Sequence, residues 1–209
     1  MRILALLALV ACKKDTTPAA APAPMAAETV EVVKGPLDQR EYGYVKLDNG
    51  MQALLIHDPD TDMAAAALDV HVGHYADPDD REGLAHFLEH MLFMGTDKYP
   101  EVDDYRNFIQ AHGGWSNAGT GGESTGYYFQ VEQAHLHEAF KRFSRFFVAP
   151  KLDPEYVDRE RNAVNSEYSL KVQDHARRIR EVRKATMNPA HPESKFSVGN
   201  LGTLDDRGD

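Results

Sequence analysis

Residues 83–96 read GLAHFLEHMLFMGT, and the interpretation of the whole sequence depends on this stretch. Most of its side chains are apolar, as in a helix that packs into a protein core. Three polar groups that can bind or carry protons interrupt the apolar run: His86, Glu89 and His90. The stretch is therefore either a core helix with a few satisfied polar residues or a helix that holds a metal ion.

The spacing of the polar residues is the spacing that a metal site needs. An α-helix turns by about 100° per residue, so His86 and His90 project from one face and can bind one ion. Glu89 lies about 80° to their side, poorly placed as a ligand but well placed to reach a water on the metal. A hydrolytic zinc site needs three protein ligands and one open position. The candidates for the third ligand are Glu160 and Glu167, which lie two turns apart on one face of a downstream helix. One of them would bind the metal, and the other would support the site.

The composition argues against two classes of protein. The chain has 209 residues, of which 42% are apolar and 27% charged, as in a soluble globular domain. A net charge of −10 argues against a nucleic-acid-binding protein, which needs a basic face toward the phosphates. No run approaches the roughly 20 consecutive apolar residues that a membrane-spanning helix needs.

The N-terminal segment is predicted to export and anchor the protein. A basic residue and then a nine-residue apolar run are typical of a secretory signal peptide. The run ends in Leu-Val-Ala-Cys, which resembles a bacterial lipobox and predicts lipidation of Cys12, the only cysteine; the alternative is an ordinary signal peptide with a chance cysteine. Residues 1–12 are thus predicted to be a lipoprotein signal peptide, and residues 13–35, rich in Ala and Pro, a flexible tether. We expect an exported bacterial lipoprotein, attached to the outer membrane by its lipid and facing the periplasm.

Residues 36–209 are predicted to form one α+β domain. Apolar and polar residues alternate on both sides of Asn49-Gly50, which predicts a β-hairpin. Further strands are expected at residues 64–72 and 125–131, whereas residues 116–124 are glycine-rich and polar. Helices are expected at residues 83–94, 101–112, 134–150 and 154–186. This order predicts a mostly antiparallel sheet covered by helices on one face. The abrupt end in DDRGD at residues 205–209 predicts that the domain is incomplete at its C-terminus.

The motif and the segments around it resemble the pitrilysin/insulysin family of zinc metallopeptidases, which carry the inverted motif His-x-x-Glu-His. The matching segments are MLFMGTDKYP at residues 91–100, SNAGTGGESTGYYF at 116–129, ERNAVNSEYS at 160–169 and NPAHPESKFSVGN at 188–200. Together they cover nearly all of the folded part. The resemblance implies the metallopeptidase domain that lies at the N-terminus of these enzymes.

The resemblance also implies a role for each candidate residue. One zinc ion (Zn2+) per chain would be bound by His86, His90 and Glu167. Glu89 would be the general base, and Glu160, the acidic residue behind the metal, is grouped with it among the catalytic residues. Asn117 and Ala118 would hold the backbone of a peptide that adds as a strand to a sheet edge.

The function that follows is a zinc-dependent endopeptidase that hydrolyses peptides or small proteins, with Glu89 activating a zinc-bound water. Family members consist of two halves, and the second half contributes an arginine and a tyrosine to substrate binding. This chain corresponds to the first part of the first half. The alternative is therefore a non-catalytic or incomplete subunit that needs a partner chain or a C-terminal half. The S-ribosylhomocysteine lyases share the motif but need a cysteine as the remaining ligand. The only cysteine here is Cys12, in the predicted export signal, so this class of enzyme is excluded.

Overall fold

A computed structural model describes residues 32–205 of the chain. They divide into two compact units with the boundary between Thr61 and Asp62, and each unit is described by itself. The predicted signal peptide, the lipidation of Cys12 and most of the predicted tether lie outside the described residues. No helix in the described part combines the length and the apolar character needed to cross a membrane.

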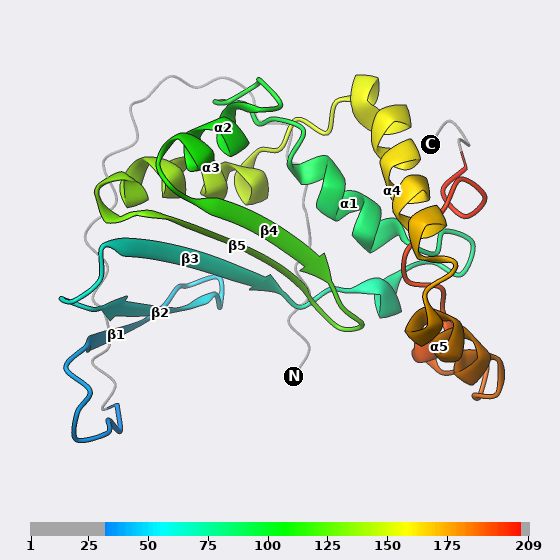
Figure 1. The fold of residues 1–209 in the computed structure, drawn as a ribbon, viewed down its shortest axis with the longest axis horizontal. Helices are drawn as coiled ribbons and strands as arrows, with labels where there is room; N and C mark the ends of the chain where they lie inside the picture. Colours follow the sequence, from blue (N-terminus) through cyan, green and yellow to red (C-terminus); the bar gives the residue numbers. More distant parts are fainter. Residues whose placement is uncertain (1–31, 206–209) are drawn as a thin grey trace. The chain divides into compact units, whose positions relative to one another are not determined.

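The first unit contains the predicted β-hairpin. Strands β1 (Glu41–Lys46) and β2 (Gln52–His57) pair antiparallel, with Tyr44 opposite Leu54. The turn between them contains Gly50 at a φ of 87°, a left-handed conformation that glycine adopts without steric cost. The hairpin prediction is confirmed (Figure 1).

The second unit contains a three-stranded antiparallel sheet in the order β3–β5–β4 (Figure 1). Its strands are β3 (Met63–Val70), β4 (Trp115–Thr120) and β5 (Thr125–Glu132). The predicted strand at residues 64–72 thus ends at Val70. Strand β4 was not expected from residue alternation, because its small and polar residues carry no apolar period. Pairing with β5, in which Asn117 lies opposite Tyr128, holds it in the sheet as an edge strand.

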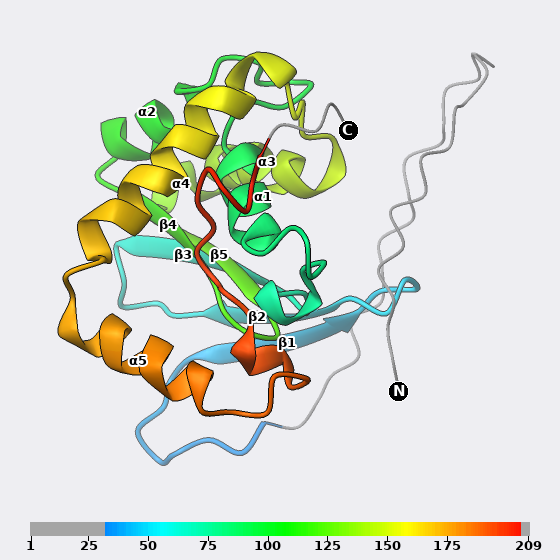
Figure 2. The same ribbon diagram turned by 90° about the vertical axis from the view of Figure 1, so that its right-hand side faces the viewer.

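Helices cover one face of this sheet (Figures 1 and 2). They are α1 (Leu84–Leu92), α2 (Asp104–Ala111) and α3 (Leu136–Val148). Short 3-10 helices are η1 (His74–Ala76), η2 (Gln133–His135), η3 (Pro154–Tyr156) and η4 (Pro192–Ser194). The buried core between the layers is filled by side chains of β5, α2 and α3, among them Phe129, Val131, Ile109, Phe143 and Phe146. The predicted α+β architecture, an antiparallel sheet with helices on one face, is confirmed.

The prediction of one long helix at residues 154–186 is wrong. The structure has two helices, α4 (Val157–Lys171) and α5 (His175–Ala185), which run in different directions (Figure 2). Between them Asp174 is extended, with φ −68° and ψ 125°, and its carboxylate accepts a hydrogen bond from the Arg177 amide at 2.9 Å. Aspartate is a strong N-cap residue, so it starts a new helix at this point.

Candidate metal centre

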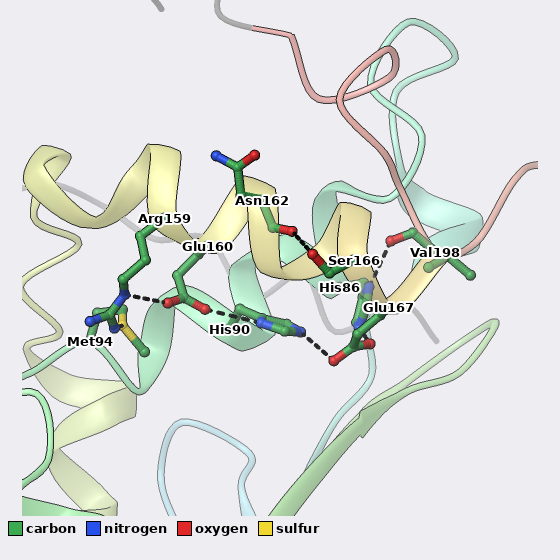
Figure 3. Close-up of polar contacts among 9 residues, drawn as sticks. All are labelled: His86, His90, Met94, Arg159, Glu160, Asn162, Ser166, Glu167 and Val198. Atoms are coloured by element: carbon green, nitrogen blue, oxygen red, sulfur yellow. Dashed lines mark hydrogen bonds and ion pairs between the residues drawn. The ribbon is translucent and has the colours of Figure 1, made fainter. Parts of the chain in front are cut away.

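Helices α1 and α4 pack together and bring His86, His90 and Glu167 to one point (Figure 3). The Nε2 atoms of His86 and His90 each lie 3.6 Å from a carboxylate oxygen of Glu167. One ligand atom from each residue lies within 4.8 Å of the other two. The three residues predicted as metal ligands are therefore neighbours, although Glu167 follows His90 by 77 positions.

The cluster fits a zinc ion in both distance and chemistry. A tetrahedral zinc with bonds of roughly 2.0–2.1 Å keeps its ligand atoms about 3.3 Å apart. The two observed separations of 3.6 Å run to different oxygens of Glu167, and one ligand atom from each residue lies within 4.8 Å of the other two, so the side chains would close by at most roughly 1.5 Å around an ion. Two imidazoles and one carboxylate are one of the ligand sets of catalytic zinc sites, and they leave one position open for a reactant. All three side chains are only partly buried, so solvent and substrate can reach that position.

The second ring nitrogen of each histidine, Nδ1, has a hydrogen-bond partner on the side away from Glu167. His86 Nδ1 lies 2.7 Å from the main-chain oxygen of Val198. A carbonyl can only accept, so His86 Nδ1 carries the hydrogen and Nε2 presents its lone pair to the cluster. His90 Nδ1 lies 3.2 Å from Oε2 of Glu160, which orients this imidazole in the same sense.

The structure separates the two candidate carboxylates. Glu160 is buried and lies against His90 Nδ1, on the side away from the cluster, while Glu167 faces both Nε2 atoms (Figure 3). The guanidinium of Arg159 donates from Nε to the other oxygen of Glu160 at 2.9 Å and offsets its buried charge. The geometry therefore gives Glu167 the place of a ligand and Glu160 the place of a residue that positions His90.

Glu89 lies on α1 next to the histidines and is buried at 8% relative exposure. The hydroxyl of Thr120, at the end of β4, donates to Oε2 of Glu89 at 2.5 Å. Burial raises the pKa of the nearby Tyr127 hydroxyl well above its usual range, and the charge of Glu89 raises it further. Glu89 is thus a fixed carboxylate beside the cluster, where a general base is expected.

The start of α1 is fixed by a buried carboxylate. Both oxygens of Asp77 accept backbone hydrogen bonds, from Gly83 at 2.8 Å and from Ala85 at 2.9 Å. These amides have no partner within the helix, and a negative charge is favourable at a helix N-terminus. Asp77 therefore holds the turn from which His86 projects.

Residues 195–199, far along the chain, pack against the start of α1. Lys195 donates from its ammonium to the main-chain oxygen of Asp77 at 2.5 Å, and Gly199 packs against Gly83. This contact brings the Val198 carbonyl to His86. The segment matches family sequence, but the group that touches His86 belongs to the main chain, so no side-chain signal could have marked it. Asp77 and Thr120 were also missed, because isolated polar residues in loops and strands are common.

Asn117 and Ala118, the predicted substrate-binding residues, lie on the edge strand β4. The Asn117 amide donates to the Tyr128 hydroxyl at 3.4 Å, and Ala118 packs against the core. Because Thr120 on the same strand contacts Glu89, β4 leads directly to the metal centre. A peptide added to this edge would pass the candidate base.

Comparisons with known proteins show what the chain is similar to. The sequence profile of insulinase (peptidase family M16) matches residues 52–195. The insulin-degrading enzyme of Mus musculus is 51% identical over 177 residues, which are 85% of this chain and 17% of that enzyme. The A-factor-processing enzyme of Saccharomyces cerevisiae is 45% identical over 175 residues, 84% of this chain and 17% of that enzyme.

A solved structure shows the same fold. The crystal structure of pitrilysin aligns with a TM-score of 0.83 and 42% sequence identity, covering 88% of this chain and 20% of that one. The chain therefore spans about a fifth or less of the length of these three relatives.

Proposed function

Because the chain belongs to the insulinase family of zinc-dependent peptidases, as its sequence motif indicated, we propose that its metal centre hydrolyses peptide bonds. The observation that carries the proposal is the convergence of His86, His90 and Glu167, with one ligand atom from each within 4.8 Å of the others. The buried carboxylate of Glu89 next to them supplies the remaining group that a hydrolytic site needs.

The chain's own residues divide the chemistry as follows. His86, His90 and Glu167 would hold one zinc ion per chain, which when bound polarises the scissile carbonyl and lowers the pKa of water. Glu89 would accept a proton from the attacking water on its free oxygen and later deliver it to the leaving amine. The hydrogen bond from Thr120 fixes the other oxygen of Glu89, so the carboxylate keeps one orientation.

The substrate would be a peptide or small protein in extended conformation. Alternate residues of an edge strand direct their N–H and C=O groups away from the sheet, and a peptide can pair with them as an added strand. Asn117 and Ala118 lie on this edge. Such pairing forms hydrogen bonds to the main chain of the peptide, so it tolerates many peptide sequences.

The second candidate is an incomplete subunit of the same fold. The observation that favours it is the coverage, because the chain matches only 17% of the insulin-degrading enzyme of Mus musculus. Donors that stabilise the transition state can lie outside this chain, and losing one such donor typically costs roughly 100- to 1000-fold in rate. A partner chain or a C-terminal half would then be needed for full activity.

One experiment tests the proposal and separates the two candidates. Zinc content and cleavage of a quenched fluorogenic peptide would be measured for the chain, for Glu89→Gln and for Glu123→Gln. Glu123 is an exposed glutamate at the β4–β5 turn and serves as the matched control. We expect one zinc per chain in all three, cleavage in the parent and the control, and loss of cleavage in Glu89→Gln.

The contradicting results are equally clear. Full cleavage by Glu89→Gln would refute its role as the base. A chain that binds zinc stoichiometrically but cleaves nothing would favour the incomplete subunit. A chain that binds no zinc would refute the hydrolytic metal centre.

Membrane attachment through Cys12 stays a separate prediction, which would place the peptidase at the periplasmic face of the outer membrane. Labelled palmitate supplied to expressing bacteria should enter the wild-type protein and not Cys12→Ser. Fractionation of the membranes would then show which one holds the protein. Equal labelling of both proteins would refute a lipid on Cys12.

A further inference from the structure

Strand β4 presents its side chains alternately to the two faces of the sheet. The half-buried residues are Ser116, Ala118 and Thr120, and the exposed residues are Trp115, Asn117 and Gly119. Ala118 packs against the core beneath the helices, and Thr120 contacts Glu89 on α1. Trp115, Asn117 and Gly119 therefore lie on the face that is turned away from the helices.

Trp115 is a large apolar side chain left in water on this face. It is 52% exposed, and its indole meets the ring of Tyr128, 37% exposed, edge to face at a centroid distance of 5.6 Å. The amide of Asn117 donates to the Tyr128 hydroxyl at 3.4 Å, and this long hydrogen bond and the contact with the indole both restrain the ring. Exposed, fixed aromatic residues are typical of binding sites, because they offer a large contact area at little cost in conformational entropy.

Next to the aromatic pair the same face is flat. Gly119 lies opposite Gly126 in the β4–β5 register, so neither strand carries a side chain there. A Cβ built on Gly119 would meet nothing within 4 Å. Toward the end of β4, Tyr128 is thus bordered by bare backbone, and no side chain of β4 or β5 stands on this face between the aromatic pair and that end of the strand.

We propose that Trp115 and Tyr128 form a binding site for an apolar, preferably aromatic, side chain of the substrate peptide. This inference rests on the proposed function, in which the peptide adds to the edge of β4. A residue of an added strand shares the face of the residue that it lies opposite. The peptide side chain opposite Trp115 would therefore pack on the indole.

The position of the preferred side chain follows from the same geometry. Thr120 contacts Glu89, so the scissile bond lies near the end of β4. Trp115 lies five positions from Thr120 on the strand. Paired strands advance in step at about 3.4 Å per residue, so the preferred side chain lies about five residues from the scissile bond.

The test uses the single tryptophan of the chain as its own reporter. The full chain carrying Glu89→Gln and loaded with zinc would be titrated with ten-residue peptides in which one phenylalanine is moved along an otherwise alanine- and serine-based sequence. We expect one position to bind about tenfold tighter than the phenylalanine-free peptide and to shift Trp115 emission to shorter wavelength. A second, dye-labelled copy of each peptide gives the Kd by anisotropy, independently of tryptophan.

Variants at position 115 decide whether the indole is responsible. In the Glu89→Gln background, Trp115→Ala should reduce the tenfold preference to less than twofold, while Trp115→Phe should retain most of it. Val148→Ala, an exposed apolar position on α3, is the control and should keep the full preference. Because Trp115 is half exposed, its replacement should leave the unfolding transition nearly unchanged, which circular dichroism would check.

The outcomes separate this inference from the proposed function. Equal affinity for the peptides with and without phenylalanine would overturn the aromatic site, while loss of cleavage in Glu89→Gln would still uphold the peptidase. Retention of the preference in Trp115→Ala would also overturn it. Absence of binding by every peptide would overturn both the site and the edge-strand mode of substrate binding, but not the zinc centre.

Discussion

Replacing Gly83 with alanine should weaken zinc binding, although this residue is not a ligand. Gly83 precedes α1 at a φ of 95°, and a Cβ there would lie 2.3 Å from the Cα of Gly199. That is roughly 1.2 Å short of an ordinary carbon–carbon contact of about 3.5 Å. The obstacle is main chain rather than a flexible side chain, so the segment around Gly199 must move.

The movement matters because Val198, next to Gly199, accepts the hydrogen bond from His86 Nδ1 at 2.7 Å. A displacement of roughly 1.2 Å along that bond brings it to about 3.9 Å, beyond the range in which a hydrogen bond holds. Loss of such a partner behind a metal ligand typically costs about 10- to 100-fold in metal affinity. This corresponds to roughly 1.4–2.7 kcal/mol of zinc-binding free energy.

The assay is competition for zinc between the chain and a chromogenic chelator. Gly50→Ala is the matched control, because Gly50 has a φ of 87° in the β1–β2 turn and its replacement costs a similar roughly 1–2 kcal/mol of backbone strain. We expect wild-type zinc affinity in Gly50→Ala and an affinity about 10- to 100-fold lower in Gly83→Ala. Equal zinc affinity in the two variants would refute the reasoning that the Val198 carbonyl orients His86.

Three further predictions concern other residues of the second unit. Glu160→Gln should lower zinc affinity by about tenfold in the chelator assay, because a neutral amide holds His90 Nδ1 less strongly, and unchanged affinity would contradict this. Val164→Ala, at a fully buried position of α4, should lower the free energy of unfolding in urea by about 2 kcal/mol, and a loss below half of that would contradict tight packing there. Burial lowers the pKa of His74 below its usual 6.5, so below pH 6.5 the unfolded chain binds a proton that the folded chain does not, and stability falls. In metal-free protein His74→Gln should flatten that part of the stability profile, and an unchanged profile would assign the pH dependence to another group.

The residues of the metal centre could be predicted from sequence because helix geometry places His86 and His90 on one face without reference to the rest of the fold. The third ligand could not be chosen in the same way. Glu160 and Glu167 share a helix face, and only the way α4 packs on α1 decides which carboxylate meets the Nε2 atoms. Family resemblance selected Glu167, and in the structure this is the carboxylate that faces both Nε2 atoms.

The parts that were missed depend on contacts between distant segments. The Val198 carbonyl is invisible in a sequence, since every residue has one, and only the packing of Gly83 on Gly199 brings it to His86. The start of α5 at Asp174 was hidden because the surrounding residues are polar and show no change of apolar period. Strand β4 forms because β5 offers it a partner.

The central claim is that His86, His90 and Glu167 together hold one zinc ion, and anomalous diffraction at the zinc edge tests it most directly. Crystals of the zinc-loaded chain should show one peak, with roughly 2.0–2.1 Å bonds to Nε2 of both histidines and to a carboxylate oxygen of Glu167. Crystals of Glu167→Ala grown under the same conditions should show that peak strongly reduced. A full-height peak in Glu167→Ala, or a wild-type ion bound to Glu160 in place of Glu167, would contradict the account.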